Sequence, residues 1–273
     1  MPVPESLAPP SYSDLVPMLR AAGCVFAEDE AQLLLSEASS TAELLVWVER
    51  RLAGEPLECI VGWAEFCGLR IAVDPGVFVP RRRTELLVSQ AAALLREGLR
   101  PHASSSGVVV DLCCGSGAVG VAVASQVSVG ELHSADIDPI AVECTRRNVA
   151  AVGGHVHRGD LYAALPPWLK KQVQLIVVNA PYVPTGLLPT MPPEARIHEP
   201  SRSLDGGFDG LHLHRRVIRE APQWLDPDGH LVIETSERQA AGTAALMAAA
   251  GLAARIVHSE ELDGTVVIGS SKV

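Results

Sequence analysis

The chain has 273 residues; 48% are hydrophobic and 20% are charged, and 32 acidic against 22 basic side chains give a net charge of -10. These values are ordinary for a globular protein, exclude a wholly disordered chain, and disfavour a nucleic-acid partner such as RNA. The six cysteines form no Cys-x-x-Cys pair, and the first residues do not resemble a secretory signal. We therefore predict no metal site, free thiols and a cytoplasmic location.

The first part of the chain shows helical spacing. From residue 11 to residue 54, apolar residues recur at the three- and four-residue intervals of a helix, and turn signals at Gly23 and at Ser39-Ser40 divide them into three groups. This pattern predicts a small helical domain over residues 1–58.

Residues 59–79 change to a shorter period broken by glycine and proline, which predicts a β-hairpin or an extended linker. Residues 84–96 return to helical spacing, and a polar, serine-rich segment follows at 102–107. We place a domain boundary in that segment. The prediction is a hairpin and linker helix over residues 59–106 and a main domain over residues 107–273.

Strands and helices alternate in the main domain. Alternation of this kind predicts an α/β fold with a mostly parallel sheet, in which ligands bind at the carboxyl ends of the strands. A long proline-rich loop is expected at about 180–206. The predicted strands are 108–111, 132–136, 155–157, 173–179, 231–234, 254–258 and 266–268, and the predicted helices run from the glycine turn to 126 and over 139–152, 211–225 and 237–250.

Residues 112–130 carry no charge and are almost long enough to span a bilayer. Eight of them are glycine, serine or glutamine, however, and three of these are consecutive at Gly115-Ser116-Gly117. A buried strand, a glycine turn and a buried helix fit this composition better than a membrane span. We therefore predict no membrane segment.

The glycine turn is the first chemical motif. Gly115-x-Gly117-x-x-Gly120 follows Asp111, and Asp136 ends the next strand 21 residues after Gly115. Read literally, this is a dinucleotide-binding fingerprint. The carboxylate of Asp111 would repel a diphosphate but attract the ammonium group of S-adenosylmethionine, and Asp136 can accept hydrogen bonds from both ribose hydroxyls. The pattern favours S-adenosylmethionine, with a nicotinamide-dependent oxidoreductase and a turn without a ligand as alternatives.

Acidic residues also follow the second and third predicted strands. Asp138 precedes Pro139, which predicts a helix N-cap. Asp160 and Leu161 follow the third strand, where the loop lies beside the adenine in this kind of fold. We expect Asp160 to contact the adenine amine, with a turn cap as the alternative, and Leu161 to form an apolar wall for the ring.

The sequence Asn179-Ala180-Pro181-Tyr182 is the most specific motif, and it follows a predicted buried strand. The Asn179 amide oxygen and the next backbone carbonyl can both accept hydrogen bonds from one planar NH₂ group, and the tyrosine ring can pack against a planar substrate. The tetrapeptide resembles the Asn-Pro-Pro-Tyr signature of methyltransferases that modify amide or exocyclic amine nitrogens. The alternative is a structural turn with a buried tyrosine.

Over roughly residues 30–270 the chain resembles the release-factor glutamine methyltransferase family. Beyond the two motifs above, the resemblance rests on segments that occur in the family's order. They are Gly54–Gly62, Phe66–Leu69, Phe78–Glu85, Glu199-Pro200, Leu204–Leu211 and Leu225-x-Pro-x-Gly229.

This resemblance implies a seven-stranded, Rossmann-like class I methyltransferase sheet with an antiparallel last strand, a linking hairpin and a helical N-terminal domain that recognises the substrate. It implies S-adenosylmethionine as the cofactor and N5-methylation of a glutamine, typically in the Gly-Gly-Gln loop of a release factor. Carried over by position, the donor site would comprise Asp111, Cys113, Gly115, Gly117, Asp136, Ile137, Asp160, Leu161 and Asn179. The catalytic segment would be Asn179, Ala180, Pro181 and Tyr182, and the substrate-binding residues would be Pro80, Arg81, Thr84, Glu85, Asn179 and Tyr182.

Two positions depart from the family pattern. Ala180 replaces the first proline of the signature, and Arg82-Arg83 stands where the family has a proline and an acid. Both changes leave the chemistry in place, but they leave open a paralogue with another target. The alternatives are an N-methyltransferase acting on an exocyclic amine of adenine or guanine in RNA or DNA, a dinucleotide-dependent oxidoreductase, and a non-catalytic binding module.

Overall fold

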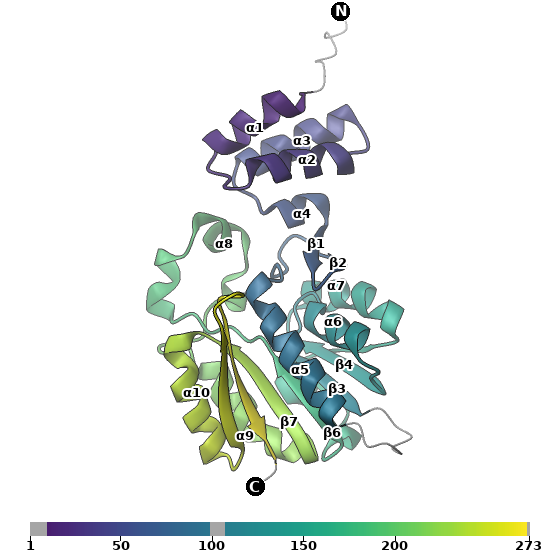
Figure 1. The fold of residues 1–273 in the computed structure, drawn as a ribbon, viewed down its shortest axis with the longest axis vertical. Coiled ribbons are helices and arrows are strands. Elements are labelled where there is room, and N and C mark those ends of the chain that lie inside the picture. Colours follow the sequence, from purple (N-terminus) through teal and green to yellow (C-terminus); the bar gives the residue numbers. More distant parts are fainter. Residues whose placement is uncertain (1–9, 99–106, 272–273) are drawn as a thin grey trace, which may run out of the picture.

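The computed structural model describes residues 10–98 and 107–271. Four helices at one end of the molecule pack around a hydrophobic core of their own (Figure 1). They are α1 (Tyr12–Ala21), α2 (Ala27–Glu37), α3 (Thr41–Leu52) and α4 (Leu57–Val61). Turns at Gly23 and at Ser39-Ser40 separate the first three helices, as the spacing predicts.

Helix α4 differs from the prediction, because it occupies the start of the segment in which the sequence pattern indicates a hairpin. Ile60 packs into the core of the N-terminal helices, and Gly62 ends the helix in the left-handed conformation with a φ of 83°. Burial of an apolar side chain against neighbouring helices therefore decides the local structure here, which the period of a short segment does not reveal.

The hairpin itself follows as β1 (Trp63–Phe66) and β2 (Leu69–Ala72). Asn148 joins it to the main domain, because its side chain accepts a hydrogen bond from the Ala72 N–H and donates one to the Ala72 carbonyl, both at 2.9 Å. A 3-10 helix (Arg82–Thr84) then leads into α5 (Glu85–Gly98). Apart from Gly107, the boundary predicted at 102–107 lies outside the described residues.

The main domain is built on the seven-stranded sheet that the resemblance implies. Its strand order is β5-β4-β3-β6-β7-β9-β8, and β9, the last strand in the sequence, is antiparallel to both neighbours. The strands are β3 (Val108–Leu112), β4 (Glu131–Asp136), β5 (His155–Arg158), β6 (Val173–Val178), β7 (Leu225–Thr235), β8 (Ala253–Ser259) and β9 (Gly264–Ser270). The helices are α6 (Ala118–Gln126), α7 (Pro139–Val149), α8 (Pro193–His198), α9 (His212–Trp224) and α10 (Glu237–Ala249), with 3-10 turns at Ala150–Val152, Leu161–Ala164, Pro167–Leu169, Thr185–Thr190 and Ser201–Ser203.

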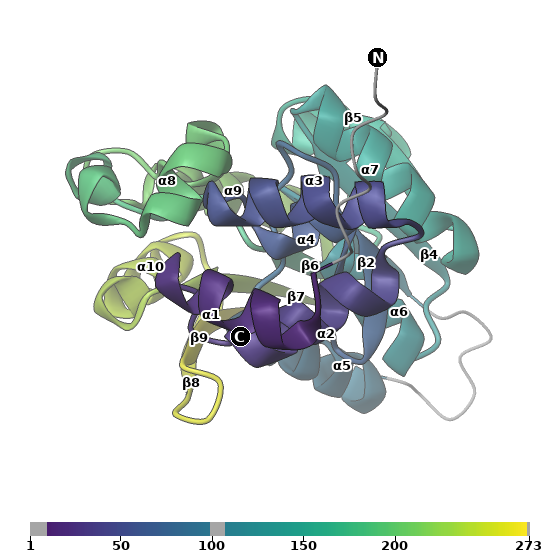
Figure 2. The same cartoon turned by 90° about the horizontal axis from the view of Figure 1, so that it is seen from above.

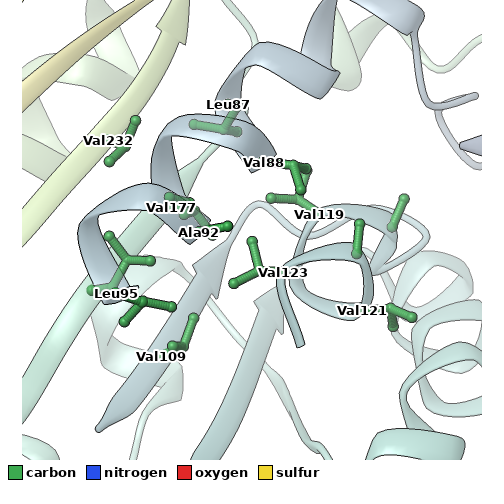
Figure 3. Packing of buried hydrophobic residues seen from close by; sticks show 14 of the residues in the cluster. Leu87, Val88, Ala92, Leu95, Val109, Val119, Val121, Val123, Val177 and Val232 are labelled. Carbon is green, nitrogen blue, oxygen red and sulfur yellow. The ribbon is translucent and has the colours of Figure 1, made fainter. Parts of the chain in front are cut away.

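Helices cover both faces of this sheet, and β6 shows the consequence. Leu175 and Val177 pack with α5 and α6 on one face, whereas Ile176 and Val178 pack with α9 and α10 on the other. Figure 3 shows Val177 among the residues of the first cluster. Successive side chains of a strand point to opposite faces, so a strand covered on both sides is apolar throughout. The uncharged segment 112–130 comprises the end of β3, the glycine turn, α6 and the connection to β4. Over residues 10–98 and 107–271, no helix is long and apolar enough to cross a membrane.

The proline-rich loop reaches the N-terminal helices. Helix α8 in this loop lies beside them in both views of the molecule (Figures 1 and 2). Arg51 of α3 pairs with Glu30 of α2 and reaches Glu194 of α8 at 3.4 Å. The N-terminal helices and the loop that follows Tyr182 are therefore in direct contact.

Candidate active site

A cavity opens at the carboxyl ends of β3, β4, β5 and β6, where a doubly wound sheet binds its ligands. The structure brings most of the residues singled out from the sequence together in its wall. Those lining it are Arg81, Cys113, Gly115, Asp136, Ile137, Asp160, Leu161, Asn179, Ala180, Pro181 and Tyr182. Pro80, Thr84, Glu85, Asp111 and Gly117 are not part of the lining.

The glycine turn is held by the carboxylate that ends β4. Asp136 accepts hydrogen bonds from the Gly115 N–H and the Asp138 N–H, both at 2.9 Å. Burial raises the pKa of Asp136 above its usual value, while these two backbone bonds oppose the shift. Asp138 caps α7 through the Ile140 N–H at 2.9 Å, which confirms the predicted N-cap.

Asp111 lies beneath the turn rather than in the cavity wall. Its side chain is 1% exposed, and its carboxylate accepts a hydrogen bond from the Gly120 N–H at 2.9 Å. Burial raises the pKa of Asp111 to about 7 from 3.8. The carboxylate is enclosed under Gly120 and does not line the cavity, and the expected direct contact between Asp111 and a ligand ammonium stays a prediction.

We predict that Asp111→Asn changes the pH dependence of stability. A folded-state pKa above the unfolded value contributes stability that is complete below about pH 4 and is lost as the pH rises through about 7. The amide of the variant cannot titrate and still has an oxygen that accepts from the Gly120 N–H. The melting temperature of the variant should therefore rise relative to that of the wild type as the pH increases from about 4 to about 7. Each kcal/mol gained corresponds to roughly 2–4 °C. Thermal unfolding of both proteins across this range measures the effect, and parallel curves would contradict it.

Two residues that follow β3 and β5 adopt backbone conformations that are uncommon for residues other than glycine. Cys113 has a φ of 57° and Leu161 a φ of 48°, and both line the cavity. Such conformations are strained and concentrate at functional sites. Next to Leu161, Asp160 is paired with Arg216 of α9 at 2.7 Å, and Arg216 also lines the cavity.

The Asn179 segment forms the opposite end. The Asn179 Nδ2 donates to Thr84 Oγ1 at 3.3 Å, and the Tyr182 hydroxyl donates to Glu234 Oε1 at 3.2 Å. Burial raises the pKa of Tyr182, and the nearby Glu234 adds to this shift. Tyr182 is therefore a neutral hydroxyl at physiological pH that donates to a buried carboxylate.

The segment Leu204–Leu211 clamps the backbone of this loop. Val183 exchanges backbone hydrogen bonds with Leu204 and Gly206, at 2.9 and 2.8 Å. Gln239 donates to both the Tyr182 carbonyl and the Asp209 carbonyl, at 2.8 and 2.9 Å. The segment Leu204–Leu211, which is among those that resemble the family, thus holds the backbone of the loop that contains Asn179.

Gly210→Ala is expected to displace this loop. Gly210 has a φ of 76°, and a Cβ there would lie 2.2 Å from the Tyr182 carbonyl oxygen. The loop must move away, and a displacement of this size next to the reacting groups should lower activity about tenfold or more. Gly186→Ala is the matched control, because its Cβ would meet nothing within 4 Å. Equal activity of the two variants would show that the clamp does not position the loop.

The three arginines occupy different environments. Arg81 forms an ion pair with the buried Glu199, and its guanidinium lies 5.2 Å from the centre of the Phe78 ring. Arg83 lines the cavity, and its Nε lies 3.7 Å from Glu234 Oε1. Arg82 is exposed and is not part of the cavity lining. The departure at position 83 therefore adds a positive charge to the cavity wall.

Glu234 is the main residue that sequence reasoning missed. It stands near the end of β7, it is 2% exposed, and it contacts both Tyr182 and Arg83. The sequence did carry a signal for it. The strand predicted over 231–234 ends in this glutamate, and a carboxylate at the carboxyl end of a parallel strand is placed to serve a site.

Known proteins resemble this chain over most of its length. The family model "Methyltransferase small domain" matches residues 68–190. A release factor glutamine methyltransferase of Bifidobacterium longum is 34% identical, with 86% of this chain and 90% of that protein covered. One of Geobacter sulfurreducens is 39% identical over 71% of this chain, and the match spans 65% of that protein.

Two further matches add to this picture. A 4-amino-L-phenylalanine/4-methylamino-L-phenylalanine methyltransferase of Streptomyces pristinaespiralis is 38% identical over 75% of this chain and 69% of its own. In structure, a methyltransferase of Pyrococcus furiosus has a TM-score of 0.54 at 15% identity, with 85% of this chain and 98% of that chain covered. This last likeness concerns the fold.

The sheet, the cavity at its carboxyl edge and the matched family model define a class I methyltransferase that uses S-adenosylmethionine. Within this class, the chain belongs to the release factor glutamine methyltransferase family.

Proposed function

We propose that this chain transfers a methyl group from S-adenosylmethionine to the side-chain amide nitrogen (N5) of a glutamine in a peptide-chain release factor. One observation carries the proposal: Asp136 and the Asn179–Tyr182 segment border the same cavity. That cavity offers a carboxylate for a nucleoside at one end and acceptors for an NH₂ group at the other. The names of the Geobacter and Bifidobacterium relatives support the choice of acceptor.

The residues at the donor end fit S-adenosylmethionine, which when bound supplies an electrophilic methyl group. Gly115 faces open space, since a Cβ there would meet nothing within 4 Å. Asp136 uses one lone pair on each carboxylate oxygen for a backbone N–H, so further lone pairs can accept from ribose hydroxyls. Cys113 and Leu161 add apolar wall for an adenine ring.

Asp111 and Gly117 act indirectly in this proposal. Asp111 fixes the first turn of α6 through Gly120, and a Cβ on Gly117 would lie 2.8 Å from the Thr145 side chain. Thr145 in turn donates to the Gly115 carbonyl at 2.7 Å. These residues shape the turn that receives the donor, and they do so without touching it.

At the acceptor end, Asn179 Oδ1 and the Ala180 carbonyl would each accept one N–H of the acceptor amide. This orients the nitrogen toward the methyl group and stabilises the positive charge that develops on it. An amide nitrogen is a weak nucleophile because its lone pair is delocalised, so orientation is the main contribution the chain can make. The alanine at position 180 retains the carbonyl that this step needs.

Arg81 and the N-terminal helices complete the proposed substrate side. Arg81 is held by Glu199 at the cavity wall, and the Arg51–Glu194 contact places the N-terminal helices against the loop that follows Tyr182. A protein loop entering the cavity would pass between these elements. We therefore assign substrate recognition to residues 1–58 together with this loop.

A second candidate acceptor is a free amino acid that carries an aromatic amine. The relative from Streptomyces pristinaespiralis is named for such substrates, and Arg83 adds to the cavity wall a cation that could pair with a carboxylate. The same pair of acceptors at Asn179 and Ala180 suits an aromatic NH₂ group.

The test is methyl transfer from labelled S-adenosylmethionine in parallel reactions. The acceptors are unmethylated release factor, the same factor with its acceptor glutamine changed to alanine, 4-amino-L-phenylalanine, and total RNA. We expect label only on the unchanged release factor. Label on the amino acid alone would transfer the assignment to the second candidate, and label on RNA alone would replace both.

A further inference from the structure

A buried network of polar side chains contacts Asn179, and two of its members, Thr84 and Glu234, are not part of the cavity lining. Thr84 is 1% exposed, and its Oγ1 accepts the hydrogen bond from Asn179 Nδ2. Glu234 is 2% exposed, accepts from the Tyr182 hydroxyl and also interacts with the Thr84 hydroxyl. Three distant segments of the chain, the 3-10 turn before α5 and the ends of β6 and β7, thus meet at one point.

The chemistry of these groups determines which of them donates and which accepts each hydrogen bond in the network. When Glu234 is ionised, its carboxylate can only accept hydrogen bonds, so the Thr84 hydroxyl donates its hydrogen bond to it. The only hydrogen of the hydroxyl is then engaged, so toward Asn179 the hydroxyl can act only as a hydrogen-bond acceptor. Burial raises the pKa of Glu234, and the Thr84 hydroxyl and Arg83, with its Nε 3.7 Å from Glu234 Oε1, oppose this rise because they favour the ionised form.

This pattern of donors and acceptors determines the orientation of the Asn179 carboxamide. A carboxamide can face Thr84 with either its nitrogen or its oxygen, and the two orientations have nearly the same shape. Only the nitrogen can donate to a hydroxyl that is already donating elsewhere. The amide oxygen is consequently turned away from Thr84, which is the orientation that an acceptor NH₂ group requires.

We propose that Thr84 and Glu234 are positioning residues that hold the Asn179 amide with its oxygen toward the acceptor nitrogen. This inference rests on the proposed function, since it assigns a purpose to the same oxygen. It gives Thr84, which we first expected to bind substrate directly, a role one step behind the cavity. It also gives a purpose to a buried glutamate whose side chain contacts Tyr182 and Arg83.

The test compares Thr84→Val with Thr84→Ser. Valine keeps the shape of threonine and removes the hydroxyl, so we expect kcat to fall about tenfold or more while the KM for S-adenosylmethionine changes less than about twofold. Serine keeps the hydroxyl and should restore kcat to near the wild-type value. A purely structural role of Thr84 would not produce this split between kcat and KM.

Thr243→Val is the matched control. Thr243 is also fully buried and also bonds through its hydroxyl, to His214 Nδ1 at 3.0 Å, but it lies on α10 outside the cavity lining. It should lose comparable stability and keep kcat. Equal kcat for Thr84→Val and wild type, or equal losses for Thr84→Val and Thr243→Val, would overturn the positioning role. A wild-type protein that methylates none of the acceptors would instead overturn the proposed function.

Discussion

Asn179→Ala is expected to lower kcat by about a hundredfold or more with the release factor as acceptor. The variant removes the Oδ1 that accepts one N–H of the acceptor amide and stabilises the charge growing on its nitrogen. Loss of a single preorganised hydrogen-bonding group of this kind has an effect of that size in other enzymes. Single-turnover methyl transfer with saturating S-adenosylmethionine measures the chemical step directly.

Gln174→Ala provides the control for this variant. Gln174 also carries a carboxamide and belongs to the same strand, β6, but it lies at the amino end of that strand, away from the cavity. Its removal should leave kcat within about twofold of the wild type. Near-wild-type turnover of Asn179→Ala would show that the amide at position 179 does not orient the acceptor.

Asp136→Asn should weaken the binding of S-adenosylmethionine by about a hundredfold. The carboxylate is proposed to accept both ribose hydroxyls, and hydrogen bonds to a charged group contribute roughly 1.5–3 kcal/mol each. The amide has only one accepting oxygen, and its NH₂ group would face the N–H of Gly115 or of Asp138. Isothermal titration with S-adenosylmethionine measures the change in Kd.

Asp74→Asn is the matched control for the donor site. Asp74 forms an ion pair with Arg147 and is not part of the cavity lining. Its replacement should leave the Kd unchanged. Equal Kd values for Asp136→Asn and the wild type, with both proteins folded, would remove Asp136 from the donor site.

The sheet and the functional residues at the carboxyl ends of its strands could be predicted because both depend on local sequence. Alternating apolar segments locate β3, β4 and β6, and a motif that directly follows a strand must lie at its carboxyl end. Gly115, Asp136 and Asn179 therefore meet in one cavity, as the order of elements requires. The family resemblance added the antiparallel last strand, which spacing alone does not reveal.

Other features could not be predicted because they depend on contacts between distant segments. The hydrogen bond between Thr84 and Asn179 joins residues 95 positions apart, and the one between Tyr182 and Glu234 joins residues 52 positions apart. The burial of Asp111 under Gly120 depends on how closely α6 approaches β3. No residue pattern along the chain encodes these distances.

The arginine triplet illustrates the same limit. Three adjacent cations suggest one shared surface, but the 3-10 turn sends them in different directions. Arg81 pairs with Glu199, Arg83 lines the cavity near Glu234, and Arg82 is exposed outside the cavity lining. Only position 83 therefore changes the charge presented to an acceptor, and this is the departure that bears on substrate choice.

The most direct measurement is peptide mass spectrometry of an unmethylated release factor after incubation with this protein and S-adenosylmethionine. The account predicts one added methyl group, located on the side-chain nitrogen of the acceptor glutamine, and its near absence when Asn179→Ala replaces the wild type. An unmodified glutamine, with the donor bound and the release factor intact, would contradict the central claim.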